Sequence, residues 1–252
     1  MGRTGRVQAY LADRLRSGPI HLTLIDPDKS LGDRAAAIAK GAAELGSDAI
    51  LLGGSTGISP DGMGQAARSI KAASALPVII FPEGPGSLTS EADAVLFMSL
   101  LNSRNLDLVI RAHVRAAPIV RSLGLEPIPL GYLVVAPGMR VGEVGAVDPV
   151  SREDPALAQG YALAAEFLGM RFVYLEAGSG APSPVPGPMV RAVRSVLSVP
   201  LIVGGGIRQA SEARALLDAG AQVLVTGTVT EEEGLGPGFR GILSEVRGAR
   251  GS

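Results

Sequence analysis

Three polar side chains end or follow apolar runs of the sequence, where they could carry out chemistry. Asp26 comes directly after HLTLI, Glu176 ends FVYLE, and Ser55 follows AILLGG. A carboxylate can orient or deprotonate a substrate hydroxyl, so we expect this role for Glu176; the alternative is a structural ion pair with an arginine. Asp26 and Ser55 would form a sparse, oxygen-only ligand set. Such a set suits Mg²⁺, because that ion keeps water ligands and accepts phosphate oxygens.

Two glycine-rich segments indicate phosphate binding. GGGIRQASEA follows the apolar run that begins at Leu201, and TGTVTEEEG follows the run that begins at Gln222. Glycine lets the backbone approach a ligand closely, and the N–H groups at a helix N-terminus bind anions without a lysine. The alternative is that Gly204–Gly206 only form a tight turn. A third segment, YLEAGSG at 174–180, adds a serine and two glycines beside Glu176.

These residues must be positioned by eight short apolar runs, which we interpret as strands. Continuous apolar runs are typical of strands that are buried on both faces, and helical patterns lie between most of them. Alternating strands and helices predict a parallel sheet, and eight strands in a chain of this length favour a closed TIM (β/α)8 barrel. In such barrels catalytic groups lie at the C-terminal strand ends, and phosphate often binds after strands 7 and 8. The expected strands are 21–26, 49–54, 78–81, 94–99, 128–135, 172–176, 201–205 and 222–227.

One interval is too short for the expected helix. Between Phe81 and Ala94 the sequence reads PEGPGSLTSEAD, with two prolines and two glycines in twelve residues. Both residue types oppose a helix, so we predict a modified barrel that lacks the third helix. The missing helix would leave an apolar opening in the outer ring; the alternative is an ordinary shortened connection.

Composition excludes several classes of function. The chain has 252 residues, a net charge of −1 and no dense basic run, which argues against nucleic acid as a partner. It has no cysteine and only two histidines, which excludes disulfides, thiol catalysis and a multi-histidine metal cluster. We expect His21 and His113 to be structural. Asp28 and Lys29 are further candidates for the site, but we expect them to be a solvated loop pair. The N-terminus is predicted to form a short amphipathic helix and lacks a signal peptide, so we expect one cytoplasmic domain over 1–252.

The segments HLTLIDPDK, LLGGSTGIS, VIIFPEGPGSLTSEADAVLFMSLLNSRN, YLVVAPG, YLEAGSG, GGGI and VTGT together resemble the geranylgeranylglyceryl phosphate synthases. The matches run in order from about residue 20 to about residue 230. Members of that family are Mg²⁺-dependent modified barrels that lack the third helix. In one branch a lysine stands two residues before the aspartate; Leu24 stands there in this chain, so it resembles the archaeal-type branch.

The resemblance implies an ether-forming prenyltransferase of phospholipid biosynthesis. It would join a polyprenyl diphosphate, geranylgeranyl diphosphate above all, to the 3-hydroxyl of sn-glycerol 1-phosphate. It also implies a homo-oligomer, dimer or hexamer, and a transient membrane contact for the lipid product. The implied Mg²⁺ ligands, Asp26 and Ser55, would lie across the barrel mouth from the glycerol phosphate. The implied glycerol phosphate contacts are Tyr174, Leu175, Glu176, Ala177, Gly178, Ser179, Gly180, Gly205, Gly206, Gly227 and Thr228.

Three other functions remain open at this point. The enzyme could be a heptaprenylglyceryl phosphate synthase, which differs in the length of the prenyl chain. It could be an isomerase or cyclase of histidine or tryptophan synthesis, but these need a second acid or base near strand 5, and YLVVAPG offers none at its exit. It could also be a non-catalytic barrel that binds a phosphometabolite. The presence of Asp26, Ser55 and Glu176 together favours catalysis.

Overall fold

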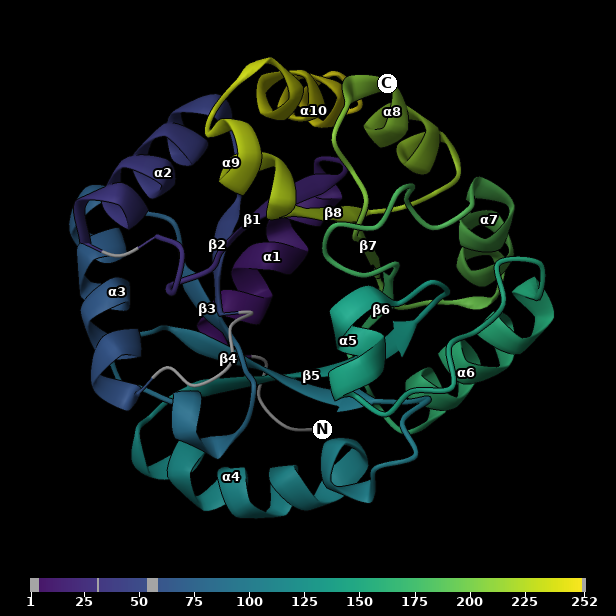
Figure 1. Ribbon diagram of the computed structural model, residues 1–252, viewed down its shortest axis with the longest axis horizontal. Helices are drawn as coiled ribbons and strands as arrows, with labels where there is room; N and C mark the ends of the chain where they lie inside the picture. The colour runs from purple at the N-terminus through teal and green to yellow at the C-terminus, as the bar shows by residue number, and fades with distance from the viewer. Residues whose placement is uncertain (1–4, 31, 54–58, 251–252) are drawn as a thin grey trace.

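The computed structural model describes residues 5–30, 32–53 and 59–250, which form a closed barrel of parallel strands (Figure 1). Each strand pairs in parallel with the next one along the chain, and β1 pairs with β8 to close the barrel. The expected barrel is therefore confirmed. The strands are β1 (Ile20–Ile25), β2 (Ala49–Gly53), β3 (Val78–Phe81), β4 (Ala94–Leu100), β5 (Glu126–Val134), β6 (Phe172–Glu176), β7 (Leu201–Gly204) and β8 (Val223–Thr226).

Helices surround the barrel, and local sequence signals fix where several of them begin. The Ser59 hydroxyl accepts a hydrogen bond from the Gly62 amide at 3.2 Å, and Asp154 accepts one from the Leu157 amide at 2.9 Å. In both cases a proline follows the cap, where its fixed φ suits the first helical turn. No helix of the described residues could span a membrane. The helices are α1 (Arg6–Arg16), α2 (Gly32–Leu45), α3 (Pro60–Ala73), α4 (Ala112–Ser122), α5 (Met139–Val144), α6 (Pro155–Phe167), α7 (Gly187–Val196), α8 (Ala210–Asp218), α9 (Thr228–Glu233) and α10 (Pro237–Gly248).

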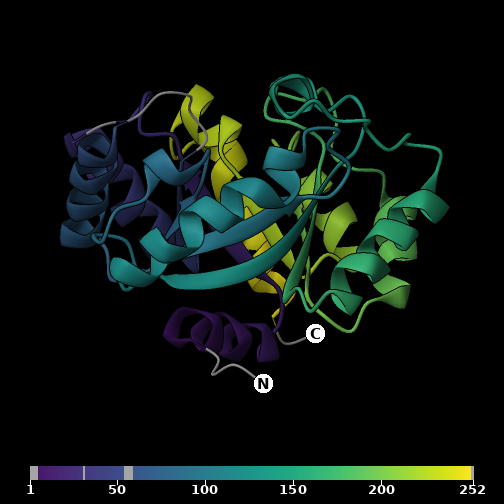
Figure 2. The same cartoon turned by 90° about the horizontal axis from the view of Figure 1, so that it is seen from below.

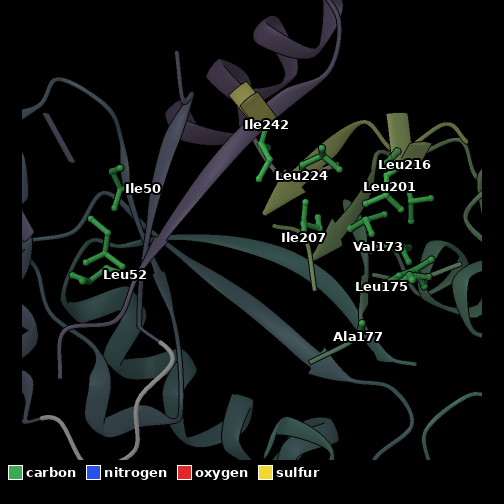
Figure 3. Close-up of a cluster of buried hydrophobic side chains, with 14 of the residues drawn as sticks. Ile50, Leu52, Val173, Leu175, Ala177, Leu201, Ile207, Leu216, Leu224 and Ile242 are labelled. Carbon is green, nitrogen blue, oxygen red and sulfur yellow. The ribbon is translucent and has the colours of Figure 1, made fainter. Parts of the chain in front are cut away.

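The side chains of each strand alternate between two hydrophobic clusters. In β6, Phe172 and Tyr174 belong to the cluster that fills the barrel interior. Val173 and Leu175 belong to the outer cluster, which packs between the strands and the helices (Figure 3). Because both faces are buried, the strands appear in the sequence as continuous apolar runs.

The predicted gap after the third strand is present. Residues 82–93, all of them described, contain only a single 3-10 turn, η1 (Pro85–Ser87), before β4 begins. The helix next in the chain is α4, preceded by a π-helical turn, η2 (Asp107–Arg111), and it runs beside β4 (Figure 1). The outer ring therefore has no α-helix between α3 and α4.

The amphipathic helix α1 lies beneath the barrel, at the end opposite to α5 and α9 (Figure 2). Its buried Val7 and Leu11 belong to the interior cluster. The Glu126 carboxylate accepts hydrogen bonds from the amides of Val7 at 2.7 Å and Gln8 at 2.8 Å. A carboxylate at a helix N-terminus satisfies free N–H groups and complements the helix dipole. The helix predicted at the N-terminus thus closes the bottom of the barrel.

The buried Asp48 ties this bottom end together. Its carboxylate accepts hydrogen bonds from Arg14 Nε of α1 at 2.8 Å and from the His21 amide of β1 at 3.0 Å, and it forms an ion pair with Arg250 near the C-terminus. The side chain of Asp48 is fully shielded from solvent, whereas that of Arg14 is 41% exposed. One carboxylate therefore links both ends of the described chain to the barrel.

We predict that Asp48→Asn lowers the free energy of unfolding by about 2–3 kcal/mol, because Arg14 and Arg250 lose their buried anionic acceptor. Urea unfolding followed by circular dichroism measures this change. The control is Asp13→Asn, which removes the exposed ion pair with Arg16 and should cost less than about 0.5 kcal/mol. Equal stability of the two variants would contradict the assigned role of Asp48.

Candidate functional site

A cavity of about 760 Å³ lies at the C-terminal ends of the strands and continues under α4. Its two ends differ in chemistry. The polar end is lined by Asp26, Lys29, Arg140, Glu176, Ser179, Arg208, Thr228 and Glu231. The apolar end is lined by Phe81, Leu88, Phe97, Met98, Leu108, Ala112, Ala116 and Val120, which come from β3, β4, η2, α4 and the residue after η1. The predicted opening in the outer ring is therefore part of the same cavity as the strand ends.

Glu176 lies where β6 reaches this cavity, and only 6% of its surface is exposed. Burial raises the pKa of its carboxyl, because a charged group loses hydration there. Hydrogen bonds from the Gly178 amide, at 2.7 Å, and from Tyr174 and Tyr132 oppose that rise in pKa. In the described part of the chain its partners are thus an amide and two tyrosines, not an arginine. A carboxylate with a raised pKa is suited to accept a proton near neutral pH.

Two glycines after β7 make room for this arrangement. Gly205 has a φ of +81°, and a Cβ there would lie 2.3 Å from Glu176 Oε1. Gly206 has a φ of +71°, and a Cβ there would lie 2.6 Å from the carbonyl carbon of Ser183. Both positions therefore require glycine for conformation as well as for space. The backbone bends at both glycines, and both also line the cavity, where a substrate can approach the backbone.

The loop after β6 is hydrogen-bonded to Thr228, which follows the end of β8. The hydroxyls of Ser179 and Thr228 lie 3.0 Å apart, and the Thr228 hydroxyl accepts a hydrogen bond from the Gly180 amide at 3.2 Å. Gly227, directly before Thr228, also lines the cavity. Predicted contacts from strands 6, 7 and 8 therefore meet at one end of the cavity.

Two of the predicted contact residues direct their side chains elsewhere. Leu175 and Ala177 are fully buried in the outer cluster, on the helix-facing side of the sheet (Figure 3). Only the backbone of these residues could contribute to the site. Tyr174 faces inward and lines the cavity, as the alternation within a strand requires. The motif YLEAGSG predicted every residue of 174–180 as a contact, although only alternate side chains of a strand can face the cavity.

Asp26 follows β1 and lines the same cavity, with 6% of its surface exposed. Its Oδ1 accepts a hydrogen bond from the Asp28 amide at 3.0 Å, and its Oδ2 lies 3.4 Å from Lys29 Nζ. Lys29 also pairs with Glu231 of α9 at 2.8 Å. Asp28 and Lys29 are both exposed in this loop, as expected, but the ion-pair partners of Lys29 are Asp26 and Glu231. Ser55 lies outside the described residues.

The expectation that Asp26 lies across the mouth from the phosphate end is also wrong. Strand β1 pairs directly with β8, so Asp26 lies on the strand next to the one that carries Gly227 and Thr228. The Lys29–Glu231 ion pair joins the two strand exits. The sequence gives the order of the strands, but only closure of the barrel makes the first and last strands neighbours.

Tyr132, Arg140 and Arg208 also line the cavity, although they were not singled out from the sequence. A signal existed for two of them. Tyr132 is in register with Tyr174 on the neighbouring strand, and Arg208 follows the GGGI segment. Arg140 lies in α5, a short helix that follows β5 and for which no pattern was recognised.

The histidines agree with the structural roles expected for them. His21 is fully buried and contacts the hydroxyls of Ser47 at 3.1 Å and Thr226 at 2.9 Å; burial lowers its pKa to about 3, so it stays neutral. His113 Nε2 lies 2.7 Å from the Met98 carbonyl oxygen, although its ring also lines the apolar part of the cavity.

The family described as PcrB matches residues 12–244 of the chain. A geranylgeranylglyceryl phosphate synthase from Pyrococcus horikoshii is 50% identical over 230 residues, 91% of each chain. An enzyme of the same name from Thermococcus kodakarensis is 46% identical over 252 residues, the full length of both. These relatives are archaeal, in agreement with the branch indicated by Leu24.

Solved structures agree with these relatives. The (S)-3-O-geranylgeranylglyceryl phosphate synthase from Thermoplasma acidophilum, in complex with its substrate sn-glycerol-1-phosphate, is 42% identical, with a TM-score of 0.92 over 98% of this chain and all of that one. A structure from Thermoplasma volcanium gives a TM-score of 0.93 at 38% identity, over 99% of this chain. The chain therefore belongs to the PcrB family, among the geranylgeranylglyceryl phosphate synthases.

Proposed function

We propose that this protein transfers a polyprenyl group, geranylgeranyl above all, from its diphosphate to the 3-hydroxyl of sn-glycerol 1-phosphate. The observation that carries the proposal is the single cavity, which joins a buried carboxylate and a glycine-lined end to an apolar channel. The names of the relatives and the substrate bound in the Thermoplasma acidophilum enzyme support it. The glycine-lined end suits the phosphate, and the apolar channel suits the prenyl chain.

In the proposed reaction Glu176 acts as the general base. The 3-hydroxyl oxygen forms a bond to C1 of the prenyl group, while the bond between C1 and the diphosphate oxygen breaks. The diphosphate leaves with the electron pair, and the hydroxyl proton moves to the Glu176 carboxylate. Burial raises the pKa of that group, which makes it a stronger base than a solvated glutamate. Ser179, Gly205, Gly206 and Thr228 would hold the phosphate, so that the hydroxyl is positioned for attack.

We also propose that Mg²⁺ is the cofactor and that Asp26 and Ser55 are its protein ligands. The described residues hold no group of three or more acidic or histidine ligands, so a metal here would take most of its ligands from water and diphosphate. That ligand set fits Mg²⁺ and does not suit a metal that takes all of its ligands from the protein. When bound there, Mg²⁺ would neutralise charge on the leaving diphosphate.

The apolar part of the cavity would bind the prenyl chain. Each buried methylene stabilises the complex by about 0.8 kcal/mol, so a long chain gains affinity from a long channel. A heptaprenyl chain would use the same channel, which makes chain length the difference between the two synthase candidates. A barrel that only binds a phosphometabolite would have no use for the channel under α4.

Homo-oligomer formation, cytoplasmic location and transient membrane contact stay predictions. Exposed apolar side chains lie on η2, α4 and α6, and their burial against a second copy of the chain would favour homo-oligomer formation. Phe167 is 82% exposed and Leu168 is 75% exposed at the end of α6, and Val114 is 67% exposed on α4.

Mass spectrometry tests the proposed function. The protein is incubated with sn-glycerol 1-phosphate, Mg²⁺ and an equal mixture of C15, C20 and C35 diphosphates. We expect the geranylgeranyl ether as the main product. A main product with the C35 chain would assign the heptaprenyl activity instead, and no product would favour a non-catalytic barrel.

We predict that Glu176→Gln lowers turnover by about a hundredfold or more, the scale of losing a general base. The variant should be at least as stable as the wild type at pH 7. The reason is that a carboxyl with a raised folded pKa contributes stability below its unfolded pKa and loses it as pH rises through the folded pKa. In the wild type, kcat/KM should rise with pH through a pKa above 4.5. Near-normal turnover of the folded variant would exclude Glu176 as the base.

We predict that Asp26→Asn raises the Mg²⁺ concentration needed for half-maximal activity and raises KM for the prenyl diphosphate more than for glycerol phosphate. The matched control is Asp28→Asn, since Asp28 lies in the same loop and lines the same cavity. Steady-state kinetics with each substrate varied in turn measures both effects. If Mg²⁺ dependence is unchanged and glycerol phosphate binding collapses, Asp26 binds the glycerol phosphate and is not a Mg²⁺ ligand.

We predict that Ala116→Trp shortens the longest prenyl chain accepted, because the indole would fill the channel beside α4. Short prenyl diphosphates should still react, and KM for glycerol phosphate should not change. The neighbouring Ala117→Trp is the control, since Ala117 is exposed on the outside of the same helix. The product distribution from the mixed diphosphates measures the effect. An identical distribution for the two variants would place the prenyl chain elsewhere.

A further inference from the structure

The loop between β6 and α7, residues 177–186, crosses the phosphate end of the cavity and carries Ser179. It contains three prolines, Pro182, Pro184 and Pro186. Proline has no backbone N–H, so this half of the loop has few donors with which to form its own hydrogen bonds. Its carbonyl oxygens must therefore find donors on other segments.

Two arginines from other segments supply those donors. Arg208, two residues after Gly206, donates from Nη1 to the Ala181 carbonyl oxygen at 2.6 Å. Arg152, before α6, donates from Nη2 to the Pro184 carbonyl oxygen at 2.8 Å. The loop is thus held at two points, one on each side of Ser183.

Each arginine is itself held in place. The Arg208 backbone amide donates to Glu212 at 2.7 Å, and its Nε lies 3.6 Å from Glu232. Arg152 Nη1 donates to the Ala136 carbonyl oxygen at 3.3 Å, in the connection after β5. The two guanidinium groups therefore connect the loop to elements on both sides of β6.

Between these two points the loop lies against the end of β7. Gly206 approaches the Ser183 carbonyl so closely that a Cβ would lie 2.7 Å from its oxygen. On the cavity side, the Gly180 amide and the Ser179 hydroxyl meet the Thr228 hydroxyl. A small outward movement of the loop would separate these groups from Gly205 and Gly206.

We infer that Arg152 and Arg208 are positioning residues that clamp the β6–α7 loop in the conformation that binds the acceptor phosphate. This inference rests on the proposed function and adds to it the residues that preorganise the phosphate site. Preorganised donors bind an anion more tightly, because no loop ordering is needed on binding. The clamp should act on the glycerol phosphate and leave prenyl diphosphate binding unchanged.

The test compares Arg152→Ala, Arg208→Ala and a control, Arg194→Ala. Arg194 likewise donates to a backbone carbonyl, that of Leu197 at 2.6 Å, but it lies at the far end of α7 and does not line the cavity. Loss of a hydrogen bond from a charged donor should raise KM for sn-glycerol 1-phosphate by about tenfold or more in each clamp variant. KM for the prenyl diphosphate should stay within about twofold. Arg194→Ala should change neither value.

Calorimetric titration with sn-glycerol 1-phosphate alone gives a second measurement that does not depend on turnover. We expect the clamp variants to bind it at least about tenfold more weakly than the control variant does. Where an alanine variant fails to fold, Arg152→Lys or Arg208→Lys replaces it, since lysine keeps the charge but loses the fixed fork geometry.

Unchanged glycerol phosphate binding in either arginine variant would overturn the clamp; a loss confined to Arg208→Ala would assign a direct charge contact instead. An equal rise in both KM values would also overturn it, since it would indicate general disruption. Wild-type product formation is measured first, so failure of the proposed function is distinguished from failure of the clamp.

Discussion

The site depends on burying one carboxylate, Glu176, at the end of a barrel strand. Burial penalises its charged form, and the Gly178 amide with two tyrosine hydroxyls partly offsets that penalty. The space for this arrangement exists because Gly205 has no side chain. The glycines that make room for the Glu176 carboxylate also line the cavity, so the proposed base and the proposed phosphate site lie side by side.

The second constraint is the helix that the chain omits after β3. In a complete barrel that helix would cover the outer face of the sheet. Here the apolar residues of β4 and α4 instead line a channel that is continuous with the strand ends. A single omission in the outer ring thus leaves an apolar channel that is continuous with the strand ends, and we propose that the prenyl chain binds there.

Much of the fold and of the candidate site could be predicted from the sequence, because the relevant signals are local. Two-sided burial makes strands visible as apolar runs, and the prolines and glycines of 82–93 exclude a helix. The pairing of Lys29 with Glu231 and the contact of Arg208 with Ala181 were not predictable, since barrel closure and loop packing bring these residues together. Successive side chains of a strand point to opposite faces, so Tyr174 and Leu175 had to point in opposite directions. This difference was predictable from the sequence, but the family motif assigned both residues to the site.

The most direct test of the account is a crystal structure with sn-glycerol 1-phosphate, Mg²⁺ and a non-reactive thiodiphosphate analogue of geranylgeranyl diphosphate. We expect the phosphate at the Gly205–Gly206 bend, the 3-hydroxyl about 2.6–3.2 Å from a Glu176 oxygen, and the prenyl chain under α4. A phosphate bound away from this bend, or a prenyl chain outside the channel, would contradict it.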